Sequence, residues 1–154
     1  MSIIVARRYR SLASLHDPDD YRPHSQLALV VDPPTTSGDY VQGISLIFEI
    51  IAPHDRIPVH RHTSDEVIVL EEGVAEVLVG EEQQRVGPGA VVFVPAGKPH
   101  GTRNVGDGVV RLHGIFASPA VTIESLDRVP APGTEGQPPQ PPAALNLRQL
   151  ADLP

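Results

Sequence analysis

The sequence contains no cysteine and no tryptophan, and it has a single methionine. Without cysteine the chain can form no disulfide, no cysteine-ligated zinc site and no iron–sulfur cluster, and it offers no thiol nucleophile. Basic residues are also few, because 12 Lys and Arg stand against 19 Asp and Glu and leave a formal net charge of −7. An acidic chain is a poor candidate for sequence-independent binding of nucleic acid or of an anionic membrane, since both need a basic surface.

Long apolar runs are missing as well. No stretch approaches the roughly 20 apolar residues that a membrane-spanning helix needs. The short apolar run at the N-terminus precedes its arginines, which is the reverse of a secretory signal. No helix-turn-helix pattern is visible in residues 1–40. We therefore expect a cytoplasmic protein with no nucleic-acid or membrane partner, and its 154 residues suit one domain.

Glycine and proline, by contrast, are abundant, and 13 Gly and 17 Pro punctuate short runs rich in Val and Ile. Because these runs are too short for helices and are regularly spaced by turn signals, they predict an all-β sandwich or barrel. Several runs are apolar on both faces, which indicates that a second sheet or a partner subunit covers the outer face. We therefore expect a homodimer. The predicted strands are 26–31, 42–51, 65–70, 74–80, 90–95, 108–116 and 120–125.

The two ends of the chain differ from this strand-rich middle. We predict an N-terminal extension over 1–39 with one or two strands, a barrel over 40–128, and a proline-rich linker with a C-terminal segment over 129–154. Six prolines and two glycines in residues 129–142 predict an extended or disordered linker. Leucines near helical spacing in residues 143–154 predict either a short docking helix, which we favour, or a frayed tail.

Four candidate metal ligands lie where turns bring predicted strands together. His60 and His62 are two residues apart, so on a strand both imidazoles point to one face, about 6.5–7 Å apart. Glu66 follows a short turn and can return from the next strand. His100 comes from a third strand, after the turn at 95–97. Three neutral imidazoles and one carboxylate suit one divalent transition ion, namely iron, manganese, nickel, copper, cobalt or zinc, and suit calcium poorly.

These residues resemble the two sequence motifs of the cupin superfamily. The first motif reads Gly, five residues, His-x-His, three or four residues, Glu, six residues, Gly, and the chain matches it from His60 to Gly73. It departs at the opening glycine, where it has His54, and this departure concerns the turn before the strand rather than a ligand. The second motif reads Gly, five residues, Pro-x-Gly, two residues, His, three residues, Asn. It is matched at every defined position from Gly89 to Asn104.

The resemblance implies a fold, a metal site and a dimer. The fold is an antiparallel double-sheet β-barrel of the jelly-roll type with six to eight strands. The implied ligands of a metal inside the barrel are His60, His62, Glu66 and His100. This ligand set resembles that of quercetin dioxygenases, acireductone dioxygenases and germin-like oxalate oxidases, although no further motif singles out one of their substrates.

Outside the motifs, three residues are candidates for a supporting role, and the catalytic residues stay unassigned. If His113 points inward from its predicted strand, it is a hydrogen-bond partner or a general base near the metal. Arg103 and Arg111 are candidates for binding an anionic substrate. The alternative for all three is an outward, solvated side chain. We expect His54 in a surface turn and Asn104 in a structural role, closing the turn that follows the second motif.

Four protein ligands leave one or two open positions on a five- or six-coordinate ion, which is typical of a catalytic site. The first hypothesis is an oxygenase that acts on a small oxygenated organic substrate chelated at the metal. The second is an isomerase or lyase for a sugar-like or keto-acid substrate, in which a redox-inert metal acts as a Lewis acid. The third is a non-enzymatic ligand-binding or sensor domain. The sequence selects neither the metal nor the substrate.

Overall fold

The computed structural model describes residues 3–31 and 41–151. The predicted boundary between residues 39 and 40 and the last residues of the predicted C-terminal segment lie outside this part of the chain. The regular structure of the described residues consists of strands, a 3-10 helix η1 (Leu12–Leu15) and a helix α1 (Leu147–Ala151). The strands are β1 (Arg10–Ser11), β2 (Gln26–Val30), β3 (Ser45–Ile51), β4 (Arg56–Arg61), β5 (Glu66–Glu72), β6 (Ala75–Val79), β7 (Glu82–Val86), β8 (Val91–Val94), β9 (His100–Asn104), β10 (Val110–Phe116), β11 (Ala120–Ser125) and β12 (Ala143–Asn146).

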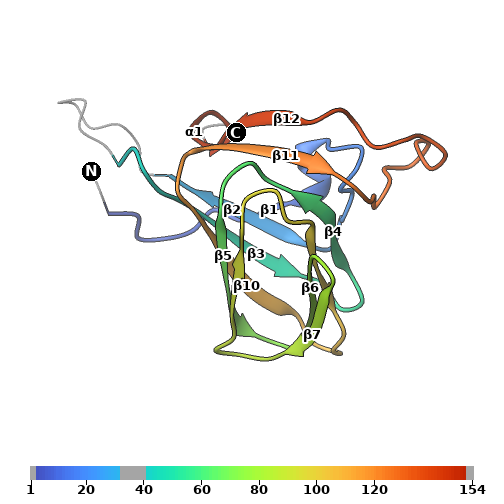
Figure 1. Cartoon of the computed structure of the whole chain (residues 1–154), viewed down its shortest axis with the longest axis horizontal. Coiled ribbons are helices and arrows are strands. Elements are labelled where there is room, and N and C mark those ends of the chain that lie inside the picture. Colours follow the sequence, from blue (N-terminus) through green and yellow to red (C-terminus); the bar gives the residue numbers. More distant parts are fainter. Residues whose placement is uncertain (1–2, 32–40, 152–154) are drawn as a thin grey trace.

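The strands build two six-stranded sheets that pack against each other (Figure 1). One sheet has the order β1-β2-β3-β10-β5-β8 and the other has the order β12-β11-β4-β9-β6-β7. All pairings within them are antiparallel. This arrangement confirms the predicted all-β, double-sheet barrel. The described part of the chain contains no helix that is long and apolar enough to cross a membrane.

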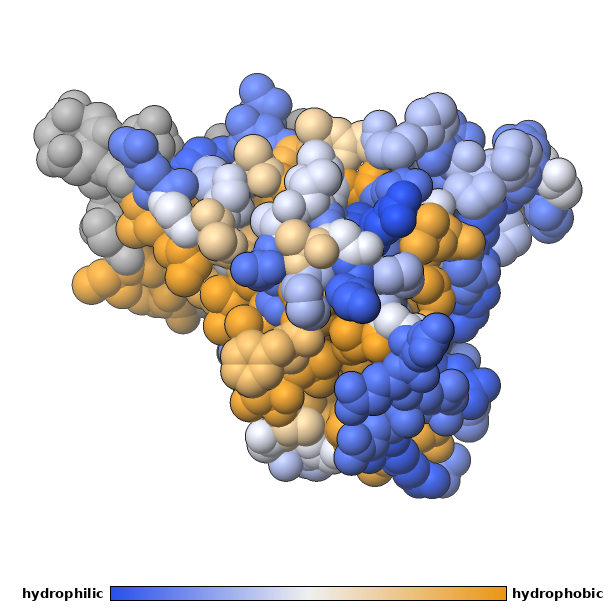
Figure 2. Space-filling model, in the orientation of Figure 1, coloured by the Kyte–Doolittle hydropathy of each residue, from blue (hydrophilic) through white to orange (hydrophobic). Residues whose placement is uncertain are grey.

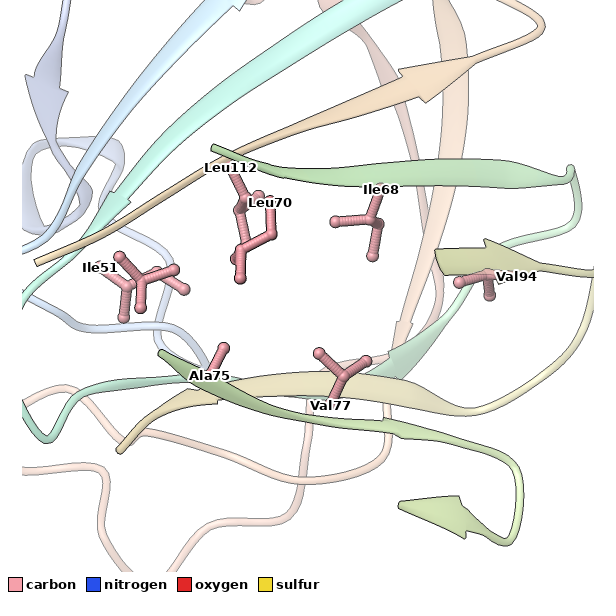
Figure 3. Close-up of a cluster of buried hydrophobic side chains, with 8 residues drawn as sticks. Ile51, Ile68, Leu70, Ala75, Val77, Val94 and Leu112 are labelled. Carbon is pink, nitrogen blue, oxygen red and sulfur yellow. The ribbon is translucent and has the colours of Figure 1, made fainter. Parts of the chain in front are cut away.

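The hydrophobic core lies between the two sheets (Figure 3). Ile68 and Leu112 come from one sheet and pack toward Ala75 and Val77 from the other. In β6, Ala75 and Val77 share the inward face, because side chains alternate along a strand. A second cluster closes the other end of the barrel, where α1 docks through Leu147, which is buried.

Five of the described strands lie outside the predicted strand ranges. β1 falls in the N-terminal extension, and β4 and β9 were expected only as the strands that carry the histidine ligands, whereas β7 and β12 were not expected at all. β7 is polar along most of its length and lies at a sheet edge with four of its five residues exposed, so it lacks the apolar alternation that marks a strand. β12 occupies the start of 143–154, where we expected a helix or a tail. That expectation was wrong for residues 143–146, because pairing with β11 draws them into the sheet before α1 begins.

Residues 130–142 form neither helix nor strand, as their prolines predict, but they are held in place. The buried guanidinium of Arg128 donates from Nε to Asp19 Oδ1 at 2.5 Å. Its Nη1 donates to the carbonyl oxygens of Thr134 and Gln137, both at 2.7 Å. One arginine therefore fastens the proline-rich segment to the N-terminal part of the chain.

Candidate metal centre

The structure brings the four predicted ligands together. His60 lies near the end of β4, His62 directly follows that strand, Glu66 begins β5 and His100 begins β9. One ligand atom from each lies within 4.8 Å of the others. His60 and His100 are direct partners in the β4–β9 pairing, whereas Glu66 belongs to the facing sheet. The group is therefore assembled from both sheets, and all its members except the half-buried His60 are buried.

Backbone carbonyls fix the orientation of every imidazole in the group. In each histidine, Nδ1 lies within hydrogen-bonding distance of a carbonyl oxygen. Because a carbonyl only accepts, Nδ1 carries the hydrogen, and in the neutral ring Nε2 then presents a lone pair to the centre. The pairs are His60 with Pro58 at 2.8 Å, His62 with Thr122 at 2.7 Å and His100 with Lys98 at 3.0 Å.

The lone pairs at the centre are crowded. Nε2 of His60 lies 3.1 Å from Nε2 of His62, and Nε2 of His100 lies 2.9 Å from Oε2 of Glu66. Electron pairs at these distances repel each other unless a proton or a metal cation lies between them. Three neutral nitrogens and one carboxylate are a donor set for a divalent transition ion, and carbonyl partners on Nδ1 are the usual support of metal-binding histidines. The residues present therefore fit the predicted metal.

The electrostatics of the group keep His60 and Glu66 in their ligand forms. Burial, together with the neighbouring His100 and His62, lowers the pKa of His60 to about 3. Burial alone would raise the pKa of Glu66, but hydrogen bonds with His100 and His62 outweigh it and lower this pKa to about 2. At neutral pH, His60 is therefore neutral and Glu66 ionised, which are the states that bind a metal.

Sequence reasoning missed Gly114, which makes room for the Glu66 carboxylate. A Cβ atom at Gly114 would lie only 2.5 Å from Oε1 of Glu66. Gly114 lies inside β10, between His113 and Ile115. A glycine inside a strand signals the close approach of another group, and this was the available sequence clue.

Two motif residues outside the ligand set shape the turns. Asn104 donates from Nδ2 to the carbonyl oxygens of Ile51 at 3.0 Å and Gly108 at 2.8 Å, so it ties the end of β3 to the turn after β9. His54 has a φ of 64°, a left-handed conformation that glycine adopts without strain. Its exposed side chain stands where the motif has glycine, so the departure leaves the shape of the turn intact.

The four groups line a cavity of about 170 Å³ inside the barrel, with walls made mostly of carbon from residues such as Ile68 and Phe116. Its wall also carries a buried ion pair that sequence reasoning missed. Nη1 of Arg22 lies 2.5 Å from Oε1 of Glu49. Burial raises the pKa of Glu49, although Arg22 opposes this effect. The sequence clue was an acidic residue in an otherwise apolar run on β3.

The three supporting candidates lie away from this centre. Inward-facing Leu112 and Gly114 flank His113, so its side chain points to the outer face of the sheet. Arg103 and Arg111 are exposed and form surface ion pairs. For Arg103 and Arg111 the structure therefore agrees with the second interpretation, an outward and solvated side chain. The carboxylate partners are Glu71 for His113 at 3.2 Å, Glu76 for Arg103 at 2.9 Å and Glu72 for Arg111 at 2.8 Å.

Comparison with known proteins identifies the family. The cupin domain family matches residues 47–116. A solved structure of an RmlC-like cupin from Shewanella frigidimarina superposes with a TM-score of 0.51, covering 61% of this chain and 76% of that chain at 17% identity. This chain is a cupin.

Two further relatives of this cupin carry named activities. A variant of salicylate 1,2-dioxygenase from Pseudoaminobacter salicylatoxidans, in complex with gentisate, has a TM-score of 0.55 at 19% identity, over 69% of the cupin and 28% of that chain. This likeness shows the fold alone. The dimethylsulfoniopropionate lyase DddQ of Ruegeria pomeroyi is 45% identical over 47 residues, which are 30% of the cupin. The match spans only 23% of that lyase.

Proposed function

We propose that this cupin is a metal-dependent enzyme of the oxygenase type, which binds a small oxygenated organic substrate at a divalent ion held by His60, His62, Glu66 and His100. The observation that carries the proposal is the convergence of three Nε2 lone pairs and one carboxylate on the wall of a carbon-lined cavity. When bound, the ion supplies open positions for two adjacent substrate oxygens and, if it is redox-active, for reaction with dioxygen.

The residues of the chain perform the other tasks of such a site. Carbonyl oxygens hold the imidazoles in one tautomer and one orientation, so the ligands are organised before any ion arrives. The apolar walls, which include Ile68 and Phe116, exclude water and favour a small organic molecule. The salicylate 1,2-dioxygenase has a similar fold, and this analogy supports an oxygenase.

A lyase is the second candidate, and a specific observation favours it. The match to DddQ is short, but at 45% identity it is a likeness of sequence and not of fold alone. In this alternative the four side chains would hold a redox-inert ion, which would supply Lewis-acid chemistry at a carbonyl or carboxylate oxygen, and turnover would need no dioxygen. An isomerase on a sugar-like or keto-acid substrate belongs to the same class.

Elemental analysis of protein purified without chelator, combined with measurement of dioxygen uptake, separates these candidates. The substrate panel contains dicarbonyl, enediol and catechol compounds. Stoichiometric iron, manganese, copper or nickel with dioxygen uptake would support the oxygenase. Stoichiometric zinc, or a redox-active metal without uptake, would favour the lyase class or a ligand-binding domain. Absence of any metal, even after reconstitution, would contradict the proposal.

The variant Glu66→Gln tests the metal centre directly. It keeps the size of the side chain but removes the negative charge from the ligand set. We expect metal affinity to fall by more than about 100-fold, beyond the about 10–100-fold typical of residues that only support ligands, while the fold is retained. Glu124→Gln, which alters a partly exposed carboxylate paired with Arg61, is the control. Equal metal affinity of the two variants would remove Glu66 from the ligand set.

A further inference from the structure

The second apolar cluster of the barrel, which includes the buried Phe116 and Leu147, is incompletely packed around the cavity. Several apolar side chains that pack against this cluster remain only partly buried. Within the described chain all of them line the cavity, namely Leu29, Ile47, Ile123, Leu145 and Leu150. Of the partly buried side chains that pack against the other cluster, Ile57 alone among the described residues lines it. The cavity is therefore the unfilled space of the second cluster.

On one sheet this apolar wall begins beside the metal centre. Ile47 is the direct partner of Gly114, over which the carboxylate of Glu66 lies. Leu29 is in turn the direct partner of Ile47. Because neighbouring strands are about 4.8 Å apart, the backbones of Ile47 and Leu29 lie roughly 5 and 10 Å from that of Gly114. A ligand bound at the metal can therefore extend over both side chains.

The other sheet supplies the opposite part of the wall. Thr122 on β11, whose carbonyl oxygen orients His62, lies between Val121 and Ile123. Since Val121 is buried in the second cluster, Ile123 points to the same inner face two residues further along the strand. Leu145 on β12 pairs directly with Val121 and shares this face. The apolar wall thus adjoins the metal ligands on both sheets.

The charged residues on the cavity wall offer no free cation to a second anionic group of a ligand. In the described chain they are one arginine and four acidic residues, namely Arg22, Asp17, Asp20, Glu49 and Glu66. Arg22 is engaged in ion pairs with Asp20 and Glu49, both at 2.5 Å. A bound divalent ion would bring the positive charges to three against four acidic groups. A negative charge at the remote end of a ligand would therefore be repelled.

We propose that the substrate carries, next to its chelating oxygen pair, an uncharged hydrocarbon group that fills the space in the second cluster. The proposal rests on the proposed function, because the ion holds the other end of the substrate. The cavity of about 170 Å³ admits a group of up to about six carbon atoms, since an apolar cavity of about 150 Å³ binds benzene. Carbon atoms around an unfilled space lack contact partners, so such a group gains their contacts as well as its own burial.

Most of the segments that build this wall flank the matched cupin domain. The four metal ligands and Ile47 lie within residues 47–116, whereas Leu29 precedes this range and Ile123, Leu145 and Leu150 follow it. The ion and the hydrocarbon group are therefore bound largely by different parts of the chain. Substitutions in the wall can change the choice of substrate without altering a metal ligand.

The test compares chelators that share two adjacent oxygens and differ in the attached group. Protein loaded with one equivalent of Zn²⁺ is titrated calorimetrically with acetohydroxamate, benzohydroxamate and 4-carboxybenzohydroxamate, which carry a methyl group, a phenyl ring and a negatively charged phenyl ring. We expect benzohydroxamate to bind at least about tenfold more tightly than acetohydroxamate, because each buried methylene group is worth about fourfold in affinity. The carboxylated compound should lose this advantage, since its charge would lie among carbon atoms and acidic groups.

Leu145→Asn keeps the approximate shape of the side chain but makes it polar. In this variant the preference for benzohydroxamate should fall below about threefold, while the affinities for Zn²⁺ and acetohydroxamate stay unchanged. Leu78→Asn is the matched control, because Leu78 is also half-buried but lies outside this cavity, and it should keep the full preference. Ile123→Phe fills the space with carbon from the protein itself. It should weaken the binding of benzohydroxamate and leave that of acetohydroxamate unchanged.

Equal affinity of the unaltered protein for acetohydroxamate and benzohydroxamate would overturn the proposal. Full preference for benzohydroxamate in both Leu145→Asn and Ile123→Phe would overturn it as well. If the carboxylated compound bound as tightly as benzohydroxamate, the hydrocarbon group would not need to be uncharged, and the proposal would be wrong on this point. Failure to bind Zn²⁺ is seen before any chelator is added, and it would contradict the proposed function itself.

Discussion

At the scale of single residues, metal binding depends on the free space beside a ligand side chain as well as on the ligand itself. Glu66 can point its carboxylate toward the three imidazoles because Gly114, on the neighbouring strand β10, has no side chain. Any larger residue at this position would compete with Oε1 of Glu66 for the same volume. Gly114 is therefore as specific a requirement of the centre as the histidines, although it offers no atom to a metal.

Gly114→Ala should weaken metal binding with little effect on stability. The added Cβ meets the end of a flexible side chain, so Glu66 moves while the backbone stays. We expect metal affinity to fall about tenfold or more, the lower range for loss of support to a ligand. The matched control is Gly87→Ala, whose added Cβ meets nothing within 4 Å. Metal titration and urea unfolding of the metal-free proteins measure both effects, and unchanged affinity in Gly114→Ala would refute this role.

The stability of the metal-free protein should fall as the pH falls. The pKa of His60 is lowered to about 3, so between its ordinary value of 6.5 and 3 the unfolded chain binds a proton that the folded chain does not. Glu66, with its pKa lowered from 4.5 to about 2, acts in the same direction below pH 4.5. Between pH 7 and pH 4.5 we expect a loss of about 2 kcal/mol, measured by urea unfolding. In His60→Gln the dependence should be flatter, and identical pH profiles would contradict the assignment.

The site residues that were predicted from the sequence differ from those that were missed in how clearly the sequence pattern marks them. His60, His62, Glu66 and His100 stand at spacings that chance rarely produces, so the group was predictable before any coordinates were known. Gly114 gave only the weak signal of one glycine in a strand. The pairing of Arg22 with Glu49 was marked only by one acidic residue in an apolar run, which does not reveal its partner. The pairing depends on which β3 residues face the cavity and on where the preceding segment folds back.

At the scale of elements, strands with clear apolar patterns were predictable and strands defined by their neighbours were not. β11 matches the predicted 120–125, and β5 and β10 lie close to their predicted ranges. The polar β7 exists because β6 offers it a hydrogen-bonding edge, and β12 exists because β11 does. Such pairings join segments through backbone atoms, which leave no trace in side-chain patterns.

We expect the fixed position of the proline-rich segment 130–142 to depend on Arg128. Arg128→Ala leaves the carboxylate of Asp19 buried without its charged partner, so we expect a loss of about 3–5 kcal/mol in the free energy of unfolding. Cleavage after Glu135 by a glutamate-specific protease should become faster, since the carbonyls of Thr134 and Gln137 lose their donor. Arg103→Ala, which removes an exposed pair, should cost less than about 1 kcal/mol. Equal stability of the two variants would show that Arg128 has no such role.

At the scale of the whole molecule, the outer face of one sheet is unusually apolar. Phe93 and Val91 on the edge strand β8 are 71% and 50% exposed, and they pair across the sheet with Val67 and Val69 on β5. In Figure 2, hydrophobic surface gathers on the side where β5 lies, whereas the side of β7 is hydrophilic. A monomer rarely exposes so continuous a patch, and we propose that a second copy of the chain covers it.

Light scattering coupled to size exclusion at micromolar concentration should therefore report a dimer. Phe93→Glu places a charge in the apolar face and should yield a monomer that retains its fold and its metal affinity. Arg85→Glu, on the exposed strand β7 of the other sheet, should leave the dimer intact. A monomeric unaltered protein, or a Phe93→Glu variant that remains dimeric, would exclude this surface as the interface.

The division of the ligands between two sheets has a consequence for how the protein matures. His60 and His100 belong to one sheet and Glu66 to the other, so no single hairpin or sheet contains the complete set. An ion bound there would connect the two sheets. Only a chain whose barrel has already formed could therefore hold it with all four ligands. Metal binding would then follow folding, and the metal content of a sample would measure the fraction of correctly folded chains. A truncated or misassembled chain would lack part of the ligand set and should bind the ion more weakly.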